Sequence, residues 1–340
     1  MSKRVDNIFR SNISFSKLLL AHKRAKKGKS LRLDVIEFEM DLEKNLISIG
    51  EELLKGTYKF GDYREFNIYE PKKRIIKVLP YKDRVVHQLI VVEMLEPIFE
   101  KDFIKDSYAC IKGRGVHLAV KTLKKYIKKI RKSNIDFWVL KCDIKSYFAS
   151  IDHVKLYNII EKRIKDKYFL DFIKKVIFCD KSGRGVPIGN YTSQYFANIY
   201  LNVLDKFIKE ILKVKYYVRY MDDYVLLLNS KEECIKLKKM IEQKLRELGL
   251  ELNPKTEYFK GYLGVNFCGY KVFYNKVNIK RKNKVRMKRW FRKIAKDFKN
   301  EKIEISDVSK KLPGVRGYLS NCSNNNLINS ILDDFVLTRQ

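Results

Sequence analysis

The sequence has few of the residues that build metal clusters, disulfide frameworks or membrane spans. Only four histidines and six cysteines occur in 340 residues. The cysteines show no paired spacing such as Cys-x-x-Cys, which argues against structural zinc and against a disulfide framework. No stretch approaches the roughly 20 apolar residues that a membrane-spanning helix requires. The first residues, MSKRVDNIFRSN, lack the apolar core of a signal peptide, so we expect a cytoplasmic protein.

Acidic side chains are outnumbered, and this imbalance indicates the chemistry of a partner. The 73 Lys and Arg against 40 Asp and Glu give a formal net charge of +33, far more than solubility requires. A polyanion is therefore the expected partner, and nucleic acid is the first candidate. An anionic membrane is the competing polyanion, but no apolar span supports it. The hydrophobic fraction of 45% suffices for the buried cores of two or three subdomains.

Hydrophobic periodicity predicts a chain of the α+β class. Helical spacing is expected in the segments 1–56, 85–99, 116–130, 195–208 and 231–248. Strand-like alternation is expected in a hairpin over 58–78, in 137–143, and in two half-strands over 216–228. After Phe273 the sequence becomes strongly basic, with Trp290 and Phe291 among the Lys and Arg residues. This last region predicts a third, helical subdomain.

Three aspartates stand at the ends of the predicted strands. Asp143 ends one strand, and Asp222 and Asp223 join the two half-strands. Asp is also an ordinary turn residue, so an Asp pair in a turn indicates little alone. Here apolar half-strands flank the pair, and uncompensated charge beside them is costly, which makes a bound metal the expected compensation. Nucleotidyl transfer needs two divalent ions on clustered carboxylates, whose hard oxygens suit Mg²⁺, with Mn²⁺ as a substitute.

The order of these motifs resembles that of reverse transcriptases. Cys142-Asp143-Ile144-Lys145-Ser146-Tyr147-Phe148 is similar to the first metal motif of that family, and Tyr220-Met221-Asp222-Asp223 to the second. The resemblance implies catalytic roles for Asp143, Asp222 and Asp223, with Ile144 beside them in the metal site. It also implies a right-hand polymerase fold with fingers, a palm whose antiparallel sheet is backed by helices, and a small helical thumb.

The same resemblance divides the chain into four segments. We expect an N-terminal helical extension over 1–56, fingers and the start of the palm over 57–135, the palm with its catalytic motifs and primer grip over 136–273, and a basic helical thumb over 274–340. No Cys/His cluster of the kind found in homing nucleases follows the thumb. A homing nuclease is therefore not expected.

Further motifs suggest roles position by position. The resemblance implies nucleotide-binding roles for Lys72 and Arg74 at the triphosphate, Phe148 as a gate against the 2′-hydroxyl, Lys255 near the pyrophosphate, and Ile188, Gly189 and Gln194 beside the nascent base pair. It implies template or primer contacts for Arg114, Tyr220, Met221, Gly269, Tyr270, Arg281, Lys288 and Arg289. In so basic a chain, any single Lys or Arg is equally a solvated surface residue. Phe148 is equally a core aromatic without the family pattern.

One loop departs from most of the family. Ile188 stands where Gln is usual, and Gln194 stands where Pro is usual. Because Ile offers none of the hydrogen bonds of an amide, we expect looser checking of the nascent base pair. The pattern Ile-Gly-Asn-x-Thr-Ser-Gln is similar to that of reverse transcriptases from diversity-generating retroelements, which lack RNase H and integrase domains and miscopy template adenines.

This narrower resemblance implies a bacterial or phage-encoded enzyme that makes mutagenic cDNA from a template-repeat RNA, as in mutagenic retrohoming. Its implied partners are the template RNA, the RNA–DNA hybrid, dNTPs and a small basic oligomeric accessory protein, with no membrane. Antiphage-defence and group II intron-like reverse transcriptases that use a dedicated non-coding RNA remain the alternative. A non-catalytic RNA-binding scaffold is a second alternative, and an RNA-dependent RNA polymerase is disfavoured by Phe148.

Overall fold

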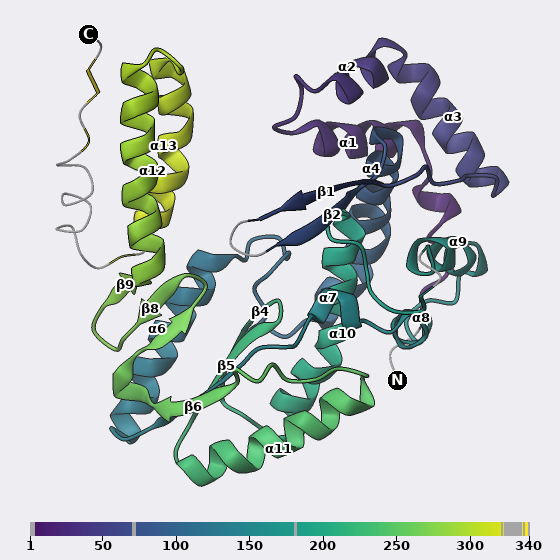
Figure 1. The fold of residues 1–340 in the computed structure, drawn as a ribbon. Coiled ribbons are helices and arrows are strands. Elements are labelled where there is room, and N and C mark those ends of the chain that lie inside the picture. The colour runs from purple at the N-terminus through teal and green to yellow at the C-terminus, as the bar shows by residue number, and fades with distance from the viewer. Residues whose placement is uncertain are drawn as a thin grey trace. The chain divides into compact units, whose positions relative to one another are not determined.

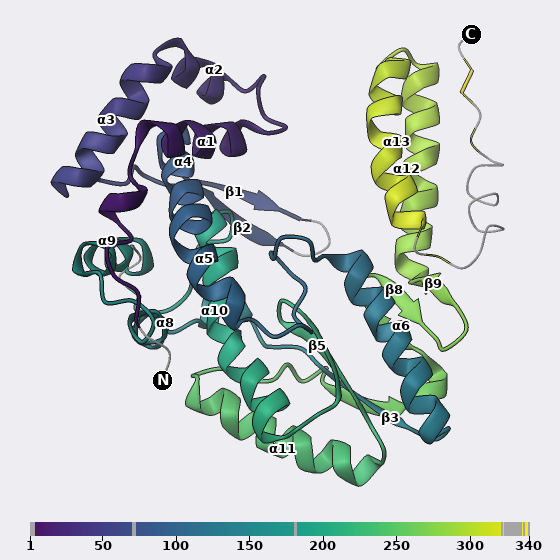
Figure 2. The same cartoon turned by 180° about the vertical axis from the view of Figure 1, so that it is seen from behind.

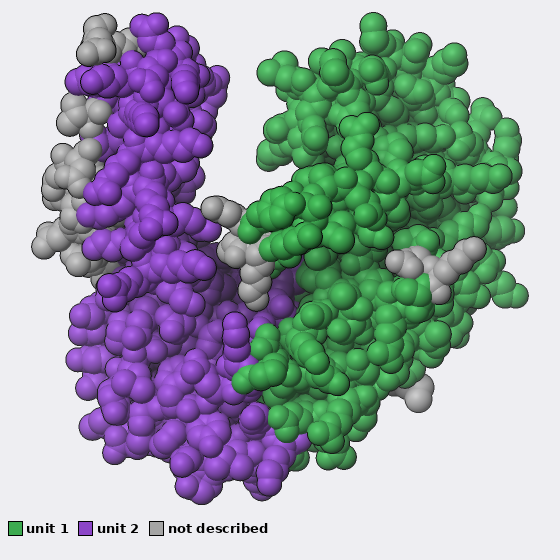
Figure 3. All heavy atoms as spheres, viewed as in Figure 1, with its two compact units in different colours: residues 1–105, 144–213, 240–254 green, residues 106–143, 214–239, 255–340 purple. Residues whose placement is uncertain are grey.

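The computed structural model describes residues 4–69, 73–179, 182–320, 322, 335 and 337–338. The chain forms two compact units, each assembled from three stretches of sequence (Figure 3). The first unit consists of residues 1–105, 144–213 and 240–254, and the second of residues 106–143, 214–239 and 255–340. The four segments expected from the sequence divide the chain by role, and that division stays a prediction.

The first unit is built mainly from helices. In chain order they are η1 (Arg10–Asn12), α1 (Phe15–Lys26), α2 (Leu33–Met40), α3 (Leu42–Lys55), α4 (Tyr81–Leu89), η2 (Ile90–Leu95), α5 (Glu96–Phe99), η3 (Glu100–Asp102), α7 (Tyr147–Ser150), α8 (His153–Glu161), α9 (Lys167–Ile177), α10 (Tyr191–Lys206) and η4 (Phe207–Ile211). The helices predicted within residues 1–56 are present. The helix predicted over 85–99 is an unbroken succession of α4, η2 and α5.

Helices α1, α2 and α3 gather around α4, as both views of the ribbon show (Figures 1 and 2). Apolar side chains at helical spacing account for this packing, because Leu18, Leu46 and Val85 are each at most 1% exposed. The Oγ of Ser14 accepts a hydrogen bond from the first turn of α1, and α3 ends at Gly56, whose φ is 72°. Both ends follow the usual capping preferences.

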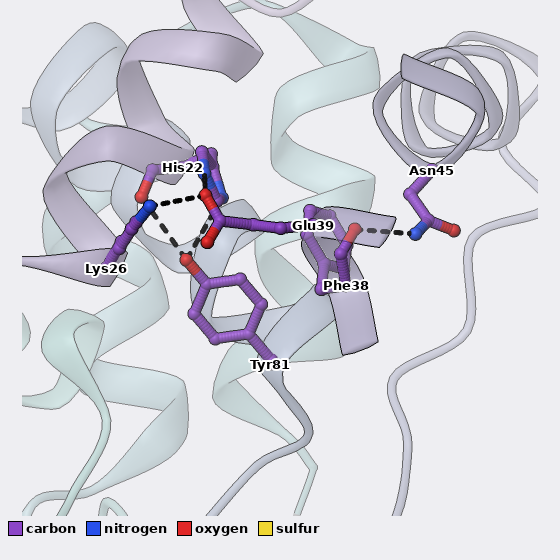
Figure 4. A network of polar contacts seen from close by, with 6 residues as sticks. All are labelled: His22, Lys26, Phe38, Glu39, Asn45 and Tyr81. Atoms are coloured by element: carbon purple, nitrogen blue, oxygen red, sulfur yellow. Dashed lines mark hydrogen bonds and ion pairs between the residues drawn. The ribbon is translucent and has the colours of Figure 1, made fainter. Parts of the chain in front are cut away.

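A partly buried polar network joins α1, α2 and α4 (Figure 4). The imidazole of His22 is 2% exposed, and its Nε2 lies 3.2 Å from Glu39 Oε1 while its Nδ1 lies 3.0 Å from the hydroxyl of Tyr81. Lys26 Nζ donates to the same oxygen of Glu39 at 2.6 Å. Because each buried polar group has a partner, the network fastens the three helices in one arrangement.

A short hairpin and one loop complete the first unit. Strands β1 (Arg64–Ile68) and β2 (Arg74–Val78) pair antiparallel, which confirms the predicted hairpin. The amide of Lys77 on β2 donates to the carbonyl of Ile188 at 2.9 Å. Gly189 has a φ of 133°, and a Cβ built on it would lie 2.3 Å from the carbonyl oxygen of Lys77. Only glycine therefore allows the loop to approach β2 this closely.

The side chains of Asn190 and Thr192 at the start of α10 contact neighbouring elements. Asn190 occupies the N-cap position, but no side-chain cap hydrogen bond forms. Its Nδ2 instead donates to the Tyr63 hydroxyl at 2.7 Å. The hydroxyl of Thr192 lies 2.7 Å from Nδ1 of His87 on α4. The two side chains thus attach the loop to neighbouring elements, and α10 begins at Tyr191 and includes most of the helical segment predicted over 195–208.

The second unit contains two antiparallel sheets. The larger has the strand order β4-β5-β3-β6 and the smaller β7-β8-β9. The strands are β3 (Trp138–Cys142), β4 (Tyr216–Tyr220), β5 (Asp223–Leu228), β6 (Glu257–Lys260), β7 (Val265–Phe267), β8 (Tyr270–Val272) and β9 (Val277–Ile279). The other elements are α6 (Val116–Ser133), η5 (Gly261–Leu263), α12 (Arg281–Lys299) and α13 (Ile305–Leu319), while α11 (Lys231–Glu247) crosses from this unit into the first. The predicted α+β class is confirmed.

One apolar core joins α6 to both sheets of the second unit. Leu123 and Ile127 of α6 meet Val139, Val225 and Phe267 from the strands, and all five are nearly inaccessible. The alternation of strand side chains gives each sheet one face for this core. The strands that carry the three aspartates are thereby held by buried packing.

The helices α12 and α13 lie side by side in both ribbon views (Figures 1 and 2). Their attachment to the smaller sheet is the turn at Gly269, whose carbonyl accepts hydrogen bonds from Asn283 Nδ2 at 3.2 Å and from the Tyr318 hydroxyl at 2.8 Å. The hydroxyl of Tyr270 donates to the Tyr318 carbonyl at 2.7 Å. The turn therefore anchors the basic helical pair.

The six cysteines are free thiols. Among the described residues, none of the helices is both long and apolar enough to span a bilayer.

Gly189→Ala tests the close approach of the loop to β2. We expect it to lower the free energy of unfolding by about 3 kcal/mol, because the new methyl group meets a backbone oxygen that cannot move aside. Gly183→Ala is the matched control: its φ is also positive, at 71°, but nothing lies within 4 Å of the added Cβ. This control should cost only about 1 kcal/mol. Equal losses in chemical denaturation would contradict the proposed steric role of Gly189.

Candidate active site

The three aspartates lie at one end of the larger sheet. Cys142 on β3 is the last paired residue opposite Tyr224 on β5. Continuing this register by one residue sets Asp143 across from Asp223, which in turn pairs with Tyr220. Asp222 belongs to the two-residue turn between β4 and β5. Residues far apart in the sequence are thus brought together at one end of the sheet, on strands that buried packing holds in place.

The turn between β4 and β5 has a strained backbone, and hydrogen bonds of Arg219 support it. Met221 has a φ of 55°, which is uncommon for a residue other than glycine and is typical of functional sites. Nη1 of Arg219 donates to the Met221 carbonyl at 3.0 Å, and Arg219 is wholly inaccessible to solvent. The backbone of Arg219 bonds to Asp106 and Tyr108 at 2.9 and 3.1 Å. These bonds hold the turn in place.

The carboxyl group of Asp223 has a perturbed pKa. Burial raises its pKa to about 6, Lys141 opposes the shift, and Asp143 and Asp222 add to it by repulsion. The Nζ of Lys141 lies 3.0 Å from Asp223 Oδ1, and the two side chains are 21% and 30% exposed. Asp143 and Asp222 therefore interact electrostatically with Asp223, and Lys141 offsets the charge of Asp223.

The carboxylates offer the hard oxygen donors that Mg²⁺ prefers. In the part of the chain that the structure describes, however, no three His, Cys, Asp or Glu side chains are arranged to hold a metal ion as they stand. One oxygen of Asp223 is engaged by Lys141. The donor chemistry thus fits a divalent cation, while the observed arrangement keeps Asp223 paired within the protein.

The loop before α10 links several predicted nucleotide-binding residues of the first unit. The carbonyl of Phe148 accepts from the amide of Val186 at 2.8 Å, and Gly185 donates to Ile151 at 2.8 Å. With the bond between Lys77 and Ile188, these contacts tie the backbone of Phe148 and β2 to a single loop. Both Phe148 and Ile188 are partly exposed.

The other predicted nucleotide-binding residues that the structure describes are exposed on separate elements. Arg74 begins β2 and is exposed, as are Gln194 near the start of α10 and Lys255 just before β6 in the second unit. Ile144, which was predicted to lie in the metal site, is buried and forms an antiparallel β-bridge with Leu252. Lys72 lies outside the described residues.

The predicted template and primer residues have different surroundings. Arg281 and Arg289 are exposed along α12, and Lys288 and Tyr220 are partly exposed. The guanidinium of Arg114 donates to the Ser107 carbonyl at 2.8 Å, so it also braces its own loop. Tyr270 is fully buried, and its side chain therefore supports the Gly269 turn instead of offering a surface to a primer.

The sequence did not predict a role for three residues of the site and its support: Lys141, Arg219 and His87. A signal existed for two of them, because Lys141 and Arg219 are charged residues within otherwise apolar strands, where a partner is needed. His87 is 3% exposed and touches Thr192. Its pairing depends on a contact between distant segments, which no local pattern predicts.

Residues 65–272 match the family model described as reverse transcriptase (RNA-dependent DNA polymerase), and this is more than half of the chain. The chain belongs to the reverse transcriptase family. Its catalytic-motif region, from the β1–β2 hairpin to β8, lies within the match. Asp143, Asp222 and Asp223 therefore lie within the matched reverse transcriptase domain.

Two curated proteins are similar to the chain over part of their length. Protein YkfC of Escherichia coli is 31% identical over 172 residues, which cover 47% of this chain and 44% of YkfC. The group II intron-encoded protein LtrA of Lactococcus lactis is 32% identical over 187 residues, which cover 51% of this chain and 30% of LtrA. The chain thus spans less than half the length of these two relatives.

Among solved structures, a truncated apo telomerase from Candida tropicalis is similar with a TM-score of 0.49 and 15% identity, covering 70% of this chain and 60% of the telomerase chain.

His87→Gln tests the buried contact that supports the loop before α10. Burial lowers the pKa of His87 to about 3, so between that value and the unfolded pKa of about 6.5 only the unfolded chain takes up the proton. The stabilisation from His87 is therefore present above the unfolded pKa and is lost as pH falls. We expect the wild type to lose about 2 kcal/mol more than the variant between about pH 7.5 and 5. Parallel denaturation curves at all pH values would refute this.

Proposed function

We propose that the chain is an RNA-directed DNA polymerase whose catalytic carboxylates are Asp143, Asp222 and Asp223. The observation that carries the proposal is the register that sets Asp143 across from Asp223, beside Asp222 in the supported turn. Two bound divalent ions would activate the primer hydroxyl and stabilise the leaving pyrophosphate. The chain supplies the oxygen ligands on a rigid sheet edge, which is the preorganisation that such chemistry needs.

Other residues are proposed to orient the nucleotide and the nucleic acid. Arg74 and Lys72 would meet the triphosphate, since guanidinium and ammonium groups pair with phosphate oxygens. Phe148 would exclude a 2′-hydroxyl by its bulk, and Lys255 would lie near the pyrophosphate. Exposed cations of α12, including Arg281 and Arg289, would neutralise the phosphates of an RNA–DNA hybrid.

We further propose that the enzyme belongs to a diversity-generating retroelement. Ile188 and Gln194 support this, because they replace the residues usual in the loop. The loop is fixed to β2 by the backbone of Ile188 and by Gly189, so the side chain of Ile188 is free to determine base-pair checking without setting the loop position. The proposed partners are a template-repeat RNA and a small basic oligomeric accessory protein.

The second candidate is a group II intron-like or antiphage-defence reverse transcriptase. The similarity to LtrA, which is encoded by a group II intron, favours the intron-like form. DNA flanking the gene separates the candidates: near-identical repeats that differ only at adenines support the retroelement, whereas a structured RNA without a variable copy supports the second candidate.

Primer extension on an RNA template with Mg²⁺ tests the polymerase proposal. The wild type should extend with dNTPs, and the Asp222→Asn, Asp223→Asn double variant should lose at least about a thousandfold of this activity, because the ligands of both ions are lost. Phe148→Ala run beside it should admit ribonucleotides. Equally low synthesis by wild type and double variant would favour a non-catalytic RNA-binding scaffold.

Ile188→Gln tests the proposed error-prone role. We expect misincorporation opposite template adenine to fall by about threefold to tenfold, because the amide restores hydrogen bonds to the nascent pair. Ile188→Val is the matched control, since it keeps an apolar side chain and should keep the error spectrum. Sequencing of cDNA from one template provides the measurement. Identical spectra for wild type and Ile188→Gln would remove Ile188 from this role.

A further inference from the structure

The ion pair between Lys141 and Asp223 is a feature of the aspartate site that the proposed polymerase chemistry does not use. Lys141 lies on β3, the strand between β5 and β6, two residues before Asp143. Because strand side chains alternate, Lys141 and Asp143 face the same side of the sheet. Lys141 is opposite Val225 on β5, so Asp223 is its diagonal neighbour, close enough for the long side chain to reach.

A second carboxylate flanks Lys141 from the other strand. Glu257 on β6 is directly opposite Lys141 in the sheet register. Directly opposed residues share a face, with Cβ atoms roughly 5 Å apart. Lys141 thus stands between an acid on each side, while its recorded ion pair is to Asp223 at 3.0 Å. Glu257 is exposed, unlike Asp223.

A divalent cation on the three aspartates would compete with Lys141 for the same carboxylate. Lys141 Nζ donates to Oδ1 of Asp223, and both side chains are mostly buried, so their attraction is less screened than at the surface. Binding of a cation there requires the ammonium group to leave this oxygen. A displaced ammonium that lost its partner would be costly, and Glu257 is the acid positioned to receive it.

We propose that Lys141 is a positioning residue that holds Asp223 in the metal-free enzyme and passes to Glu257 when a divalent cation binds. The inference rests on the proposed function, because it concerns the same three aspartates. Lys141 weakens cation binding by occupying Asp223, and Glu257 strengthens it by accepting the displaced ammonium. The two residues therefore set the cation affinity in opposite directions.

The test measures the dissociation constant of Mn²⁺ for the full chain, without template or nucleotide, by electron paramagnetic resonance of the free ion. Lys141→Met should bind Mn²⁺ about threefold to tenfold more tightly, and Lys141→Arg should stay within about twofold of wild type. Glu257→Gln should bind about twofold to fivefold more weakly. If Lys141 had only a structural role, Lys141→Met and Glu257→Gln would not shift the Mn²⁺ dissociation constant in opposite directions.

The double variant Lys141→Met, Asp223→Asn shows whether the effect acts through Asp223. Adding Lys141→Met to Asp223→Asn should leave the affinity unchanged. Unchanged Mn²⁺ affinity in both Lys141→Met and Glu257→Gln would overturn the inference, as would a Lys141 effect that persists without Asp223. Because Glu257 is exposed, Glu257→Gln keeps the test decisive even if Lys141→Met fails to fold.

A final comparison separates this inference from the proposed function. If the Asp222→Asn, Asp223→Asn variant binds Mn²⁺ as the wild type does, the proposed metal site itself is wrong. If that variant loses binding while Lys141→Met and Glu257→Gln match the wild type, only the role of Lys141 is wrong.

Discussion

Negative charge concentrated at one end of the larger sheet constrains how the second unit is built. Three carboxylates repel one another there, and burial raises the pKa of Asp223 to about 6. Packing of the sheet against α6 holds the strands together against this repulsion. Lys141 offsets part of the charge, and Arg219 holds the turn that carries Asp222. The polymerase chemistry that we propose requires this charge to stay available to divalent cations while the sheet stays folded.

In the first unit, hydrogen bonds hold the loop before α10 at a fixed place. Backbone hydrogen bonds attach the loop to Phe148, Ile151 and β2, and Gly189 allows the close approach. Buried side chains secure the start of α10, where Thr192 meets His87. This support is independent of the Ile188 side chain. A substitution of the Ile188 side chain therefore need not disturb the fold.

Local patterns predicted the parts of the molecule that local physics determines. Alternation over 137–143 and the apolar half-strands around Asp222 predicted three strands and the turn, and family membership agrees with the motifs they carry. The partner of Lys141 could not be predicted, because it depends on the register between β3 and β5. The same holds for Gly189, whose reason is a carbonyl on a distant strand. Tyr270 looked like a primer contact in the sequence, yet packing encloses its side chain.

If Asp143, Asp222 and Asp223 form a cation site from which Lys141 must withdraw, a crystal structure of the wild type grown with Mn²⁺ should show it through the anomalous signal of the metal. We expect a peak among the three carboxylates, with Lys141 Nζ moved from Asp223 toward Glu257. Mn²⁺ bound elsewhere, or a Lys141 that still pairs with Asp223 beside a bound ion, would contradict it.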